Sequence, residues 1–290
     1  MGSAPTLTVG VPVFNMGAYL EAAVESILSQ SFADFEVIIS DNASTDETES
    51  VGRALAARDS RVTYRRNPEN LGLSANNNLL VPLARGRLFK WAPADDMLLP
   101  GYLDRCIGAL EADPSVVLAY PQTRFVDGDG APLDLHDPGY HLVSEDPSER
   151  LRYAILANQF ANAGLGVIRT DALRRTRLLP RYAGGDFRLL AELSLLGRFV
   201  EIPEALYVRR IHKGSTGGNV GNTRWLRTYW SGSRPVMRLP YWRLSRDHAG
   251  IVLRAPIPRR RKVRLLGQLL WTMAYRWRQL LRELVEAIRL

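Results

Sequence analysis

The 290-residue sequence has little of several features that would assign a protein to a class at sight. Its single cysteine, Cys106, excludes an internal disulfide framework and a cysteine-based zinc site, and it fits a reducing compartment. No stretch reaches about 18 uncharged apolar residues, so we expect no membrane-spanning helix. Residues 1–13 lack the basic and then apolar segments of a secretory signal. Together these absences predict a cytoplasmic protein.

Two glycine-rich motifs that cradle nucleotide phosphates are also absent. The sequence contains neither G-x-G-x-x-G nor G-x-x-x-x-G-K-[ST]. If the protein binds a nucleotide, its phosphates must therefore be held in another way.

Acidic residues are scarce at the C-terminal end. Residues 224–290 carry 16 Lys and Arg against 3 Asp and Glu, whereas the rest of the chain carries 22 against 27. An acidic body argues against a nucleic-acid-binding core. The basic end is open to three interpretations: a solvated tail that favours solubility, a site for anionic lipid, or a contact with another chain.

The first 120 residues alternate between short apolar runs and segments with helical spacing. At this length the chain can form one large domain with an appendage. The alternation predicts an α/β fold with a mainly parallel central sheet and right-handed crossovers. We expect strands at residues 7–13, 35–40, 62–65, 88–91 and 116–120, and helices at 16–30, 46–58, 74–84 and 100–112.

The second half has a different pattern. Residues 121–148 predict a loop or hairpin region, and later patterns predict helices at 148–158, 171–177 and 186–196, short strands at 200–202 and 205–210, and a basic amphipathic helix at 259–290. We therefore expect a domain over 1–217, with a nucleotide-binding half (1–120) and an acceptor and catalytic half (121–217). A helical basic C-terminal extension follows over 218–290.

Acidic residues stand where two of the predicted strands end. Asp41 follows the run 35–40, and Asp95-Asp96 follows the run 86–91. In open α/β sheets, ligands bind outside the carboxyl ends of the strands. Carboxylates there suit a phosphate only if a divalent cation lies between them. The alternatives are an Asx turn at Asp41 and a capping pair at Asp95-Asp96.

Three further segments carry groups of chemical interest. Residues 11–15 place a proline and an aromatic ring where a flat base could lie, although such turns are often structural. Asp186 opens a helix and is either a general base or a first-turn acid. His212 could bind a metal or phosphate or be an ordinary surface residue, and the neighbouring basic residues suit a diphosphate.

The order and spacing of these motifs resemble a known family. The matching text comprises Val11-Pro12-Val13-Phe14-Asn15, Ile39 to Asp46, Asn70-Leu71-Gly72-Leu73-Ser74, Asn78, Ala84-Arg85-Gly86, Asp95-Asp96 with Pro100, Gly185-Asp186, and Arg210 with His212 and Ser215. In this order it resembles the family 2 glycosyltransferases of the GT-A fold, which are inverting enzymes that use nucleotide-diphospho-sugars. The resemblance covers roughly residues 5–217.

The resemblance implies a role for each matching residue. Asp186 corresponds to the catalytic base. The residues expected to contact the nucleotide are Pro12, Phe14, Asn15, Asp41, Asn70, Gly72, Asn78 and Asp95. Those expected to bind a divalent cation, Mn²⁺ or Mg²⁺, are Asp96, Asp95 and His212. Those expected to contact the diphosphate and acceptor are Arg210, Lys213, Gly164 and Gly185. Arg209 is a further cation suited to the departing diphosphate.

The sequence departs from the family pattern at two positions. Pro93 stands where the family often has the first aspartate of Asp-x-Asp-Asp, which puts strict metal dependence in question. Gly185 stands where the family often has the glutamate of Glu-Asp, which removes a supporting charge but keeps the base.

The resemblance implies a hexosyltransferase-type enzyme with a UDP- or dTDP-sugar donor. Its acceptor would be a hydroxyl or amine of a glycan, a lipid-linked glycan or a small molecule, and nucleic acid is not an expected partner. The rivals are a catalytically impaired nucleotide-sugar-binding protein and a nucleotidyltransferase, although the latter's glycine-rich basic N-terminal signature is missing. The C-terminal extension would support a homodimer or peripheral contact with the inner face of the membrane, while its tryptophans are expected mainly to pack in a core.

Overall fold

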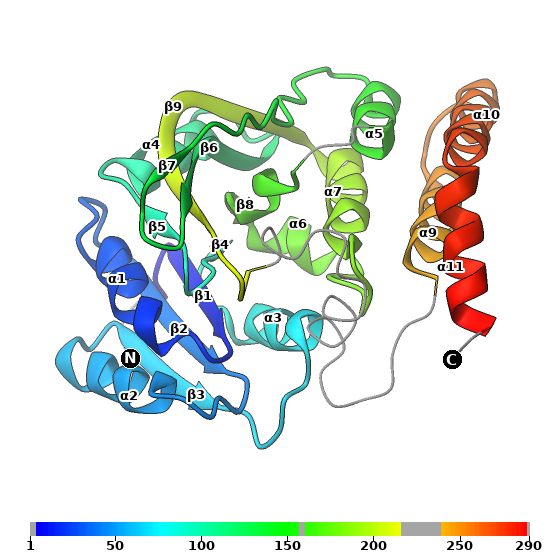
Figure 1. Cartoon of the computed structure of the whole chain (residues 1–290). Helices are drawn as coiled ribbons and strands as arrows, with labels where there is room; N and C mark the ends of the chain where they lie inside the picture. Colours follow the sequence, from blue (N-terminus) through cyan, green and yellow to red (C-terminus); the bar gives the residue numbers. More distant parts are fainter. Residues whose placement is uncertain (1–3, 157–159, 216–238, 289–290) are drawn as a thin grey trace.

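A computed structural model describes residues 4–156, 160–215 and 239–288, with side chains up to 285 (Figure 1). Its centre is a curved mixed sheet with the strand order β3-β2-β1-β4-β8-β6-β9-β5, and β7 pairs with β6. Helices cover both faces of the sheet. The α/β class predicted from the sequence is confirmed.

The first half of the chain forms the parallel part of the sheet, as its alternating pattern predicts. Strand β1 pairs in parallel with β2 and β4, and β2 pairs in parallel with β3. Strands β1, β2 and β4 are almost wholly buried, which explains their continuous apolar runs, whereas the edge strand β3 is mostly exposed. The elements are β1 (Leu7–Val13), α1 (Gly17–Leu28), β2 (Phe35–Asp41), α2 (Thr48–Arg58), β3 (Val62–Arg66), α3 (Leu73–Leu83), β4 (Leu88–Trp91) and α4 (Tyr102–Ala112).

The second half makes the sheet mixed. Strand β6 (Val116–Asp127) is much longer than the predicted run to Tyr120, and β9 (Arg198–Ile211) is one strand where two short ones were predicted. The two pair in parallel along their length, with a register shift opposite Pro203 that lets a proline remain within β9. Two short antiparallel strands, β5 (Met97–Leu98) and β8 (Val167–Arg169), were not predicted, whereas β7 (Pro132–Leu133) forms a hairpin with β6 inside the predicted loop or hairpin region.

Helices of the second half pack beside this part of the sheet. All but the short η1 (Asn162–Leu165) were predicted to within a few residues, although the end of the predicted helix at 148–158 lies outside the described residues. The others are α5 (Pro147–Leu156), α6 (Thr170–Arg174) and α7 (Gly185–Leu196).

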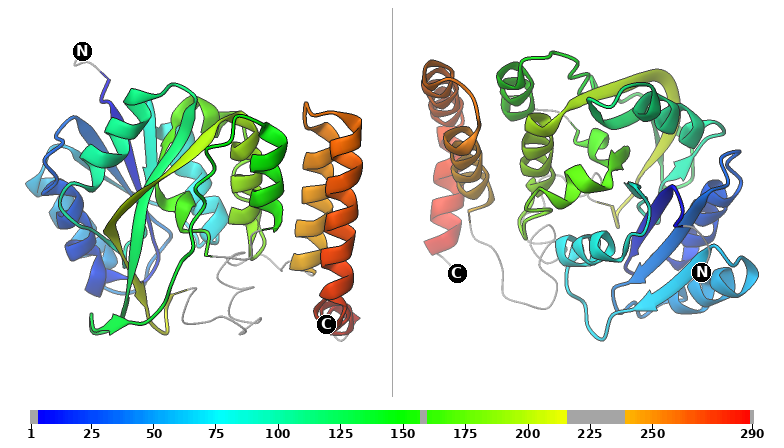
Figure 2. Two further views of the ribbon diagram at one scale, coloured as in Figure 1. Left: turned by 90° about the horizontal axis from the view of Figure 1, so that it is seen from above. Right: turned by 180° about the vertical axis from the view of Figure 1, so that it is seen from behind.

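The C-terminal helices form a layer at one side of the molecule (Figure 2). Helix α9 (Pro240–Arg254), which was not predicted, packs on α7, and α10 (Arg259–Tyr275) packs on α5. The single helix predicted over 259–290 is interrupted at Arg276, and α11 (Trp277–Ile288) continues from there. Among the described residues, no helix has the length and apolar content needed to span a bilayer.

Candidate active site

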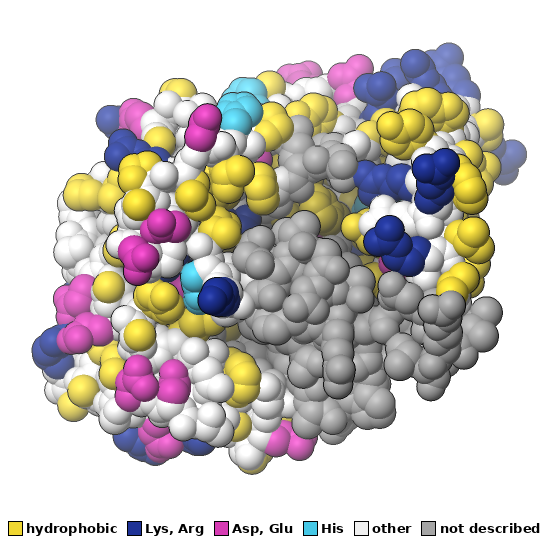
Figure 3. All heavy atoms as spheres, viewed as in Figure 1, with side chains coloured by type: hydrophobic (Ala, Val, Ile, Leu, Met, Phe, Trp, Pro, Cys, Tyr) yellow, Lys and Arg dark blue, Asp and Glu magenta, His cyan; other side chains and the backbone are white. Residues whose placement is uncertain are grey.

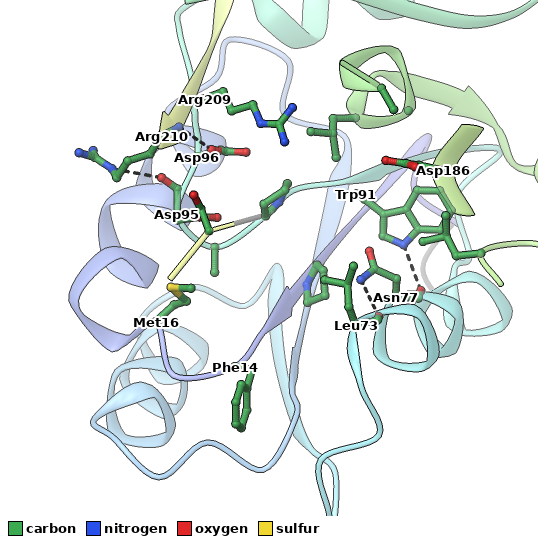
Figure 4. Close-up of a pocket in the computed structure, with 18 of the residues that line it drawn as sticks. Phe14, Met16, Leu73, Asn77, Trp91, Asp95, Asp96, Asp186, Arg209 and Arg210 are labelled. Carbon is green, nitrogen blue, oxygen red and sulfur yellow. Dashed lines mark hydrogen bonds between the residues drawn. The ribbon is translucent and has the colours of Figure 1, made fainter. Parts of the chain in front are cut away.

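One pocket lies at the carboxyl ends of β1 and β4, between the start of α7 and the end of β9 (Figure 4). Residues from six segments of the chain converge there, which is the position expected for a ligand site in an α/β sheet. Its lining comprises Pro12, Phe14, Met16, Leu73, Asn77, Trp91, Pro93, Ala94, Asp95, Asp96, Ala161, Gly164, Leu165, Leu179, Asp186, Leu189, Arg209, Arg210 and Ser215.

Asp95 and His212 form a polar pair at the pocket. The His212 Nε2 atom lies 3.0 Å from Asp95 Oδ2. The Nδ1 atom of His212 accepts a hydrogen bond from the Gly214 backbone at 3.2 Å, so in this arrangement Nε2 carries the proton and donates to Asp95. A carboxylate and an imidazole that face each other suit an ion such as Mn²⁺, which would replace the Nε2 proton.

Asp96 has a different environment although it is the next residue. Its side chain is 7% exposed, and both its oxygens accept hydrogen bonds, one from the Tyr207 hydroxyl and one from the Arg210 backbone at 2.9 Å. Burial, and then the neighbouring Asp95, raises the pKa of Asp96 to about 7. Asp96 thus fastens the end of β9 to the pocket, and its oxygens are less available to a metal than those of Asp95.

The described residues offer a metal ion few protein ligands. No three of their His, Cys, Asp or Glu side chains are grouped closely enough to hold an ion. Asp95 and His212 fit an ion that takes its other ligands from a diphosphate and water, as Mg²⁺ and Mn²⁺ do in many nucleotide sites.

Asp186 lies across the pocket from Asp95 and Asp96 (Figure 4). It occupies the first turn of α7, where Oδ1 accepts a hydrogen bond from the Phe187 backbone at 3.0 Å. Burial raises the pKa of Asp186 above its ordinary value, and Arg209 opposes that effect. A carboxylate that holds a proton more readily than usual is suited to general-base chemistry.

The two glycines before Asp186 shape its turn. Gly184 has a φ of 82°, a left-handed conformation that favours glycine. A Cβ at Gly185 would lie 2.6 Å from the Pro180 ring, so the position that often carries a glutamate in the family has no room for a side chain here.

The predicted cations divide into pocket and surface residues. Arg210 lines the pocket, donates to the Asp95 carbonyl at 3.3 Å and lies over the Tyr19 ring. Arg209 also lines it and donates to the Asn162 side chain. Lys213 is exposed and does not line the pocket. Arg209 is thus the cation that faces both Asp96 and Asp186.

The predicted nucleoside residues build a framework beside the pocket. Pro12 and Phe14 line the pocket, whereas Asp41 is fully buried and accepts hydrogen bonds from Tyr64 at 2.6 Å and Arg66 at 2.7 Å. The exposed Asn15 binds the Thr45 backbone through its side-chain oxygen at 2.7 Å.

The turn before α3 belongs to the same framework. Asn70 accepts a hydrogen bond from the Gly72 backbone at 2.9 Å, and Gly72 has a φ of 82°. The Asn78 amide group bonds in both directions to the Leu179 backbone, so Asn78 holds that loop and lies outside the pocket lining. The neighbouring Asn77 faces the pocket instead.

Several pocket residues were given no site role from the sequence. Trp91 is buried at the pocket and donates through Nε1 to the Asn77 carbonyl at 3.0 Å, and Met16, Leu73 and Leu189 add apolar surface. An apolar side chain in a core and one in a pocket look alike in sequence, and only the position of Trp91 at a strand end was a usable signal.

Comparison with known proteins identifies the family. The sequence model of "Glycosyl transferase family 2" matches residues 8–180. Chondroitin synthase of Pasteurella multocida (strain Pm70) is 27% identical over 217 residues, which is 73% of this chain and 21% of that protein. A Campylobacter jejuni protein named GalNAc(5)-diNAcBac-PP-undecaprenol beta-1,3-glucosyltransferase is 40% identical over 100 residues, 34% of this chain and 32% of its own. The chain thus spans about a fifth to a third of these relatives.

Solved structures establish the fold. Staphylococcus aureus TarS 1–349, in complex with UDP-GlcNAc, has a TM-score of 0.68 at 18% identity, covering 91% of this chain and 71% of that chain. The mannosyltransferase PcManGT from Pyrobaculum calidifontis, with GDP-Man and Mn²⁺, has a TM-score of 0.55 at 19% identity, covering 94% and 76%. With the fold of these GT-A enzymes and a family match over more than half its length, the chain belongs to glycosyl transferase family 2.

Proposed function

We propose that this glycosyltransferase moves a sugar from a nucleotide-diphospho-sugar to an acceptor with inversion at the anomeric carbon. The observation that carries the proposal is the placement of Asp186 and Asp95 on opposite sides of one pocket (Figure 4), with His212 hydrogen-bonded to Asp95. An inverting single displacement needs a base on one face of the sugar and a stabilised leaving group on the other.

On the leaving-group side, Asp95 and His212 would hold a divalent cation, Mn²⁺ or Mg²⁺, which supplies charge neutralisation to the diphosphate. Asp96 keeps Arg210 and the end of β9 in place beside it. Arg209 and Arg210 add positive charge at the pocket, where negative charge grows as the sugar departs. Because the protein would supply only these two ligands, the cation would bind mainly together with the donor diphosphate.

On the acceptor side, Asp186 would remove the proton from the attacking hydroxyl or amine. Gly164, in η1, lines the same side of the pocket and leaves space there, since a Cβ at this position would meet only Leu190 at 4.0 Å. Asp137 and Arg209 bind the Asn162 side chain beside it, so this corner is rigid. The segment around η1 would therefore shape the acceptor site.

The nucleoside would lie between Phe14, Pro12 and the α3 turn at Gly72, with Asp41 beneath it. We propose a UDP- or dTDP-sugar as donor and a glycan, lipid-linked glycan or small molecule as acceptor. The names of the relatives support this range of acceptors, because they include chondroitin synthase and GalNAc(5)-diNAcBac-PP-undecaprenol beta-1,3-glucosyltransferase.

The test is Asp186→Asn in the full chain. General-base catalysis contributes about 10² to 10⁴ in rate, so we expect kcat to fall by that range while UDP binding is unchanged. Because burial raises the pKa of Asp186, the wild-type rate should fall as pH drops through that raised pKa. For the same reason, ionised Asp186 destabilises the fold as pH rises above the unfolded pKa, so the variant's Tm at pH 7 should be equal or higher.

Asp171→Asn is the matched control, since Asp171 is also a first-turn aspartate but is exposed on α6. It should leave transfer within about twofold of wild type. Near wild-type transfer by a folded Asp186→Asn protein would refute the assignment of the base.

A further inference from the structure

The C-terminal helices expose a continuous apolar stripe on the side away from the body. Val263, Leu270 and Trp271 of α10 expose 70%, 65% and 71% of their surface, and Trp277 of α11 exposes 56%. Helical spacing brings these residues onto one side, opposite Leu265, Leu269 and Leu280, which are buried. The outer face comprises Val263, Leu270, Trp271, Tyr275, Trp277, Leu281, Leu284 and Val285.

The exposed aromatic residues of the outer face contact each other and a neighbouring cation. The Trp271 and Tyr275 rings stack with centroids 5.9 Å apart, and Arg278 lies over the Trp277 ring at 5.5 Å. An exposed apolar area of this extent is unusual on a protein surface and indicates an interaction site. Core packing, which the sequence suggested for the tryptophans, is wrong for Trp271 and Trp277; Trp225 and Trp230 lie outside the described residues.

The charge beside the outer face is predominantly positive. Residues 259–288 carry eight Lys and Arg and two Asp and Glu. One acid, Glu283, is buried and accepts a hydrogen bond from the Tyr241 backbone at 3.1 Å. Arg260, Arg278 and Arg282 are exposed, and Figure 3 shows Lys and Arg intermingled with apolar side chains over these helices.

We propose that this outer face binds the surface of a bilayer that contains anionic lipids. An amphipathic helix with Trp, Tyr and Leu on one side and arginines beside them is suited to lie in the headgroup region, where apolar side chains enter the lipid and cations meet phosphate. A second copy of the chain fits less well, because a self-complementary contact would bring the arginines of both copies together with few acids to pair them.

The test is flotation of the full chain with vesicles of phosphatidylcholine, with and without phosphatidylglycerol. The wild-type chain should float with the anionic vesicles, and less so as salt rises. Arg260→Gln/Arg278→Gln/Arg282→Gln should lower the bound fraction at least about tenfold, since each cation near the surface contributes to binding. Trp271→Ser/Trp277→Ser should weaken binding even at low salt, since it removes the inserted apolar surface.

Arg53→Gln/Arg58→Gln/Arg105→Gln is the matched control, because it removes the same charge from exposed positions on α2 and α4. It should float like wild type. All variants should keep the wild-type circular dichroism spectrum, because the substituted side chains are exposed.

Two results would overturn the proposal. One is a failure of the wild-type chain to float with anionic vesicles at low salt. The other is self-association in sedimentation equilibrium that Trp271→Ser/Trp277→Ser abolishes, which would assign the outer face to a second copy. Neither readout involves sugar transfer, so the proposal stands or falls apart from the proposed function.

Discussion

At the scale of the residue, the neighbours Asp95 and Asp96 illustrate what a motif can predict. Their type and their position after a strand predicted a site at the sheet edge, and both residues line the pocket there. Their different environments depend on residues far along the chain. Tyr207 and Arg210 donate hydrogen bonds to Asp96, whereas His212 pairs with Asp95. The sequence alone gives no sign of which aspartate is buried.

A calorimetric titration of Mn²⁺ in the presence of UDP distinguishes the role of Asp95 from that of Asp96. Asp95→Asn should weaken Mn²⁺ binding at least tenfold, because it removes a charged ligand that faces the pocket. Asp96→Asn should change Mn²⁺ affinity less, because the oxygens of Asp96 already accept hydrogen bonds from Tyr207 and Arg210. The reverse order of affinities would show that Asp96 is the principal ligand.

Lys90 shows a second limit of prediction at this scale. In sequence it interrupts an apolar strand, and a lysine there would be expected to reach solvent. In the structure it is fully buried, donates to the Tyr102 hydroxyl at 3.0 Å and to the Leu165 carbonyl, and lies over the Tyr102 ring. Burial lowers the pKa of Lys90 to about 7.

At the scale of the element, strands were predicted where their own sequence shows a clear pattern. They were missed where they form only by pairing with a segment remote in sequence. β1 and β2 were recognised from their own apolar runs. β8, of three residues, and β5, of two, exist only because neighbouring strands pair with them. The long β9 contains polar residues and a proline, so its continuity depends on β6 beside it.

Helix α9 also acts at this scale, because it holds both ends of the segment that carries Asp186. Asp247 accepts a hydrogen bond from Tyr182 at 2.7 Å and lies 3.4 Å from the Arg188 guanidinium, and both partners flank Asp186. Arg188 in turn donates to the Arg177 carbonyl at 2.9 Å. Asp247 would thus be a positioning residue for the proposed base, since it would act on Asp186 through the backbone between Tyr182 and Arg188.

Asp247→Asn should lower kcat by about 10- to 100-fold and change the donor KM by less than about threefold. The variant leaves the Arg188 charge uncompensated and loosens the turn, but it does not touch the nucleotide side. Steady-state kinetics measure kcat and the donor KM separately. The control is Arg243→Gln, which removes an exposed charge from the same helix. A rise in KM with kcat intact would contradict the positioning role.

At the scale of the whole molecule, the C-terminal helices share the core of the catalytic body. Ile251 and Val252 of α9 and Leu265 of α10 belong to the same buried cluster as Leu189 of α7 and Leu118 of β6. The sequence suggested an extension after residue 217 because charge and pattern change there. The charge pattern reports on the outer surface of these helices. It does not predict how their inner surface packs on the body, and that packing determines whether the chain unfolds cooperatively.

The shared cluster predicts that the chain unfolds in one cooperative transition, with equal calorimetric and van't Hoff enthalpies. Ile251→Ala should then destabilise the whole molecule by about 2–5 kcal/mol, because it opens a cavity between α9 and the body. Hydrogen exchange tests whether the destabilisation extends to β1, which is remote from Ile251. If the β1 amides open only with global unfolding, their free energy of opening should fall by the same amount as the free energy of unfolding. Two resolved transitions, with β1 exchange unchanged, would instead establish the C-terminal helices as an independent unit.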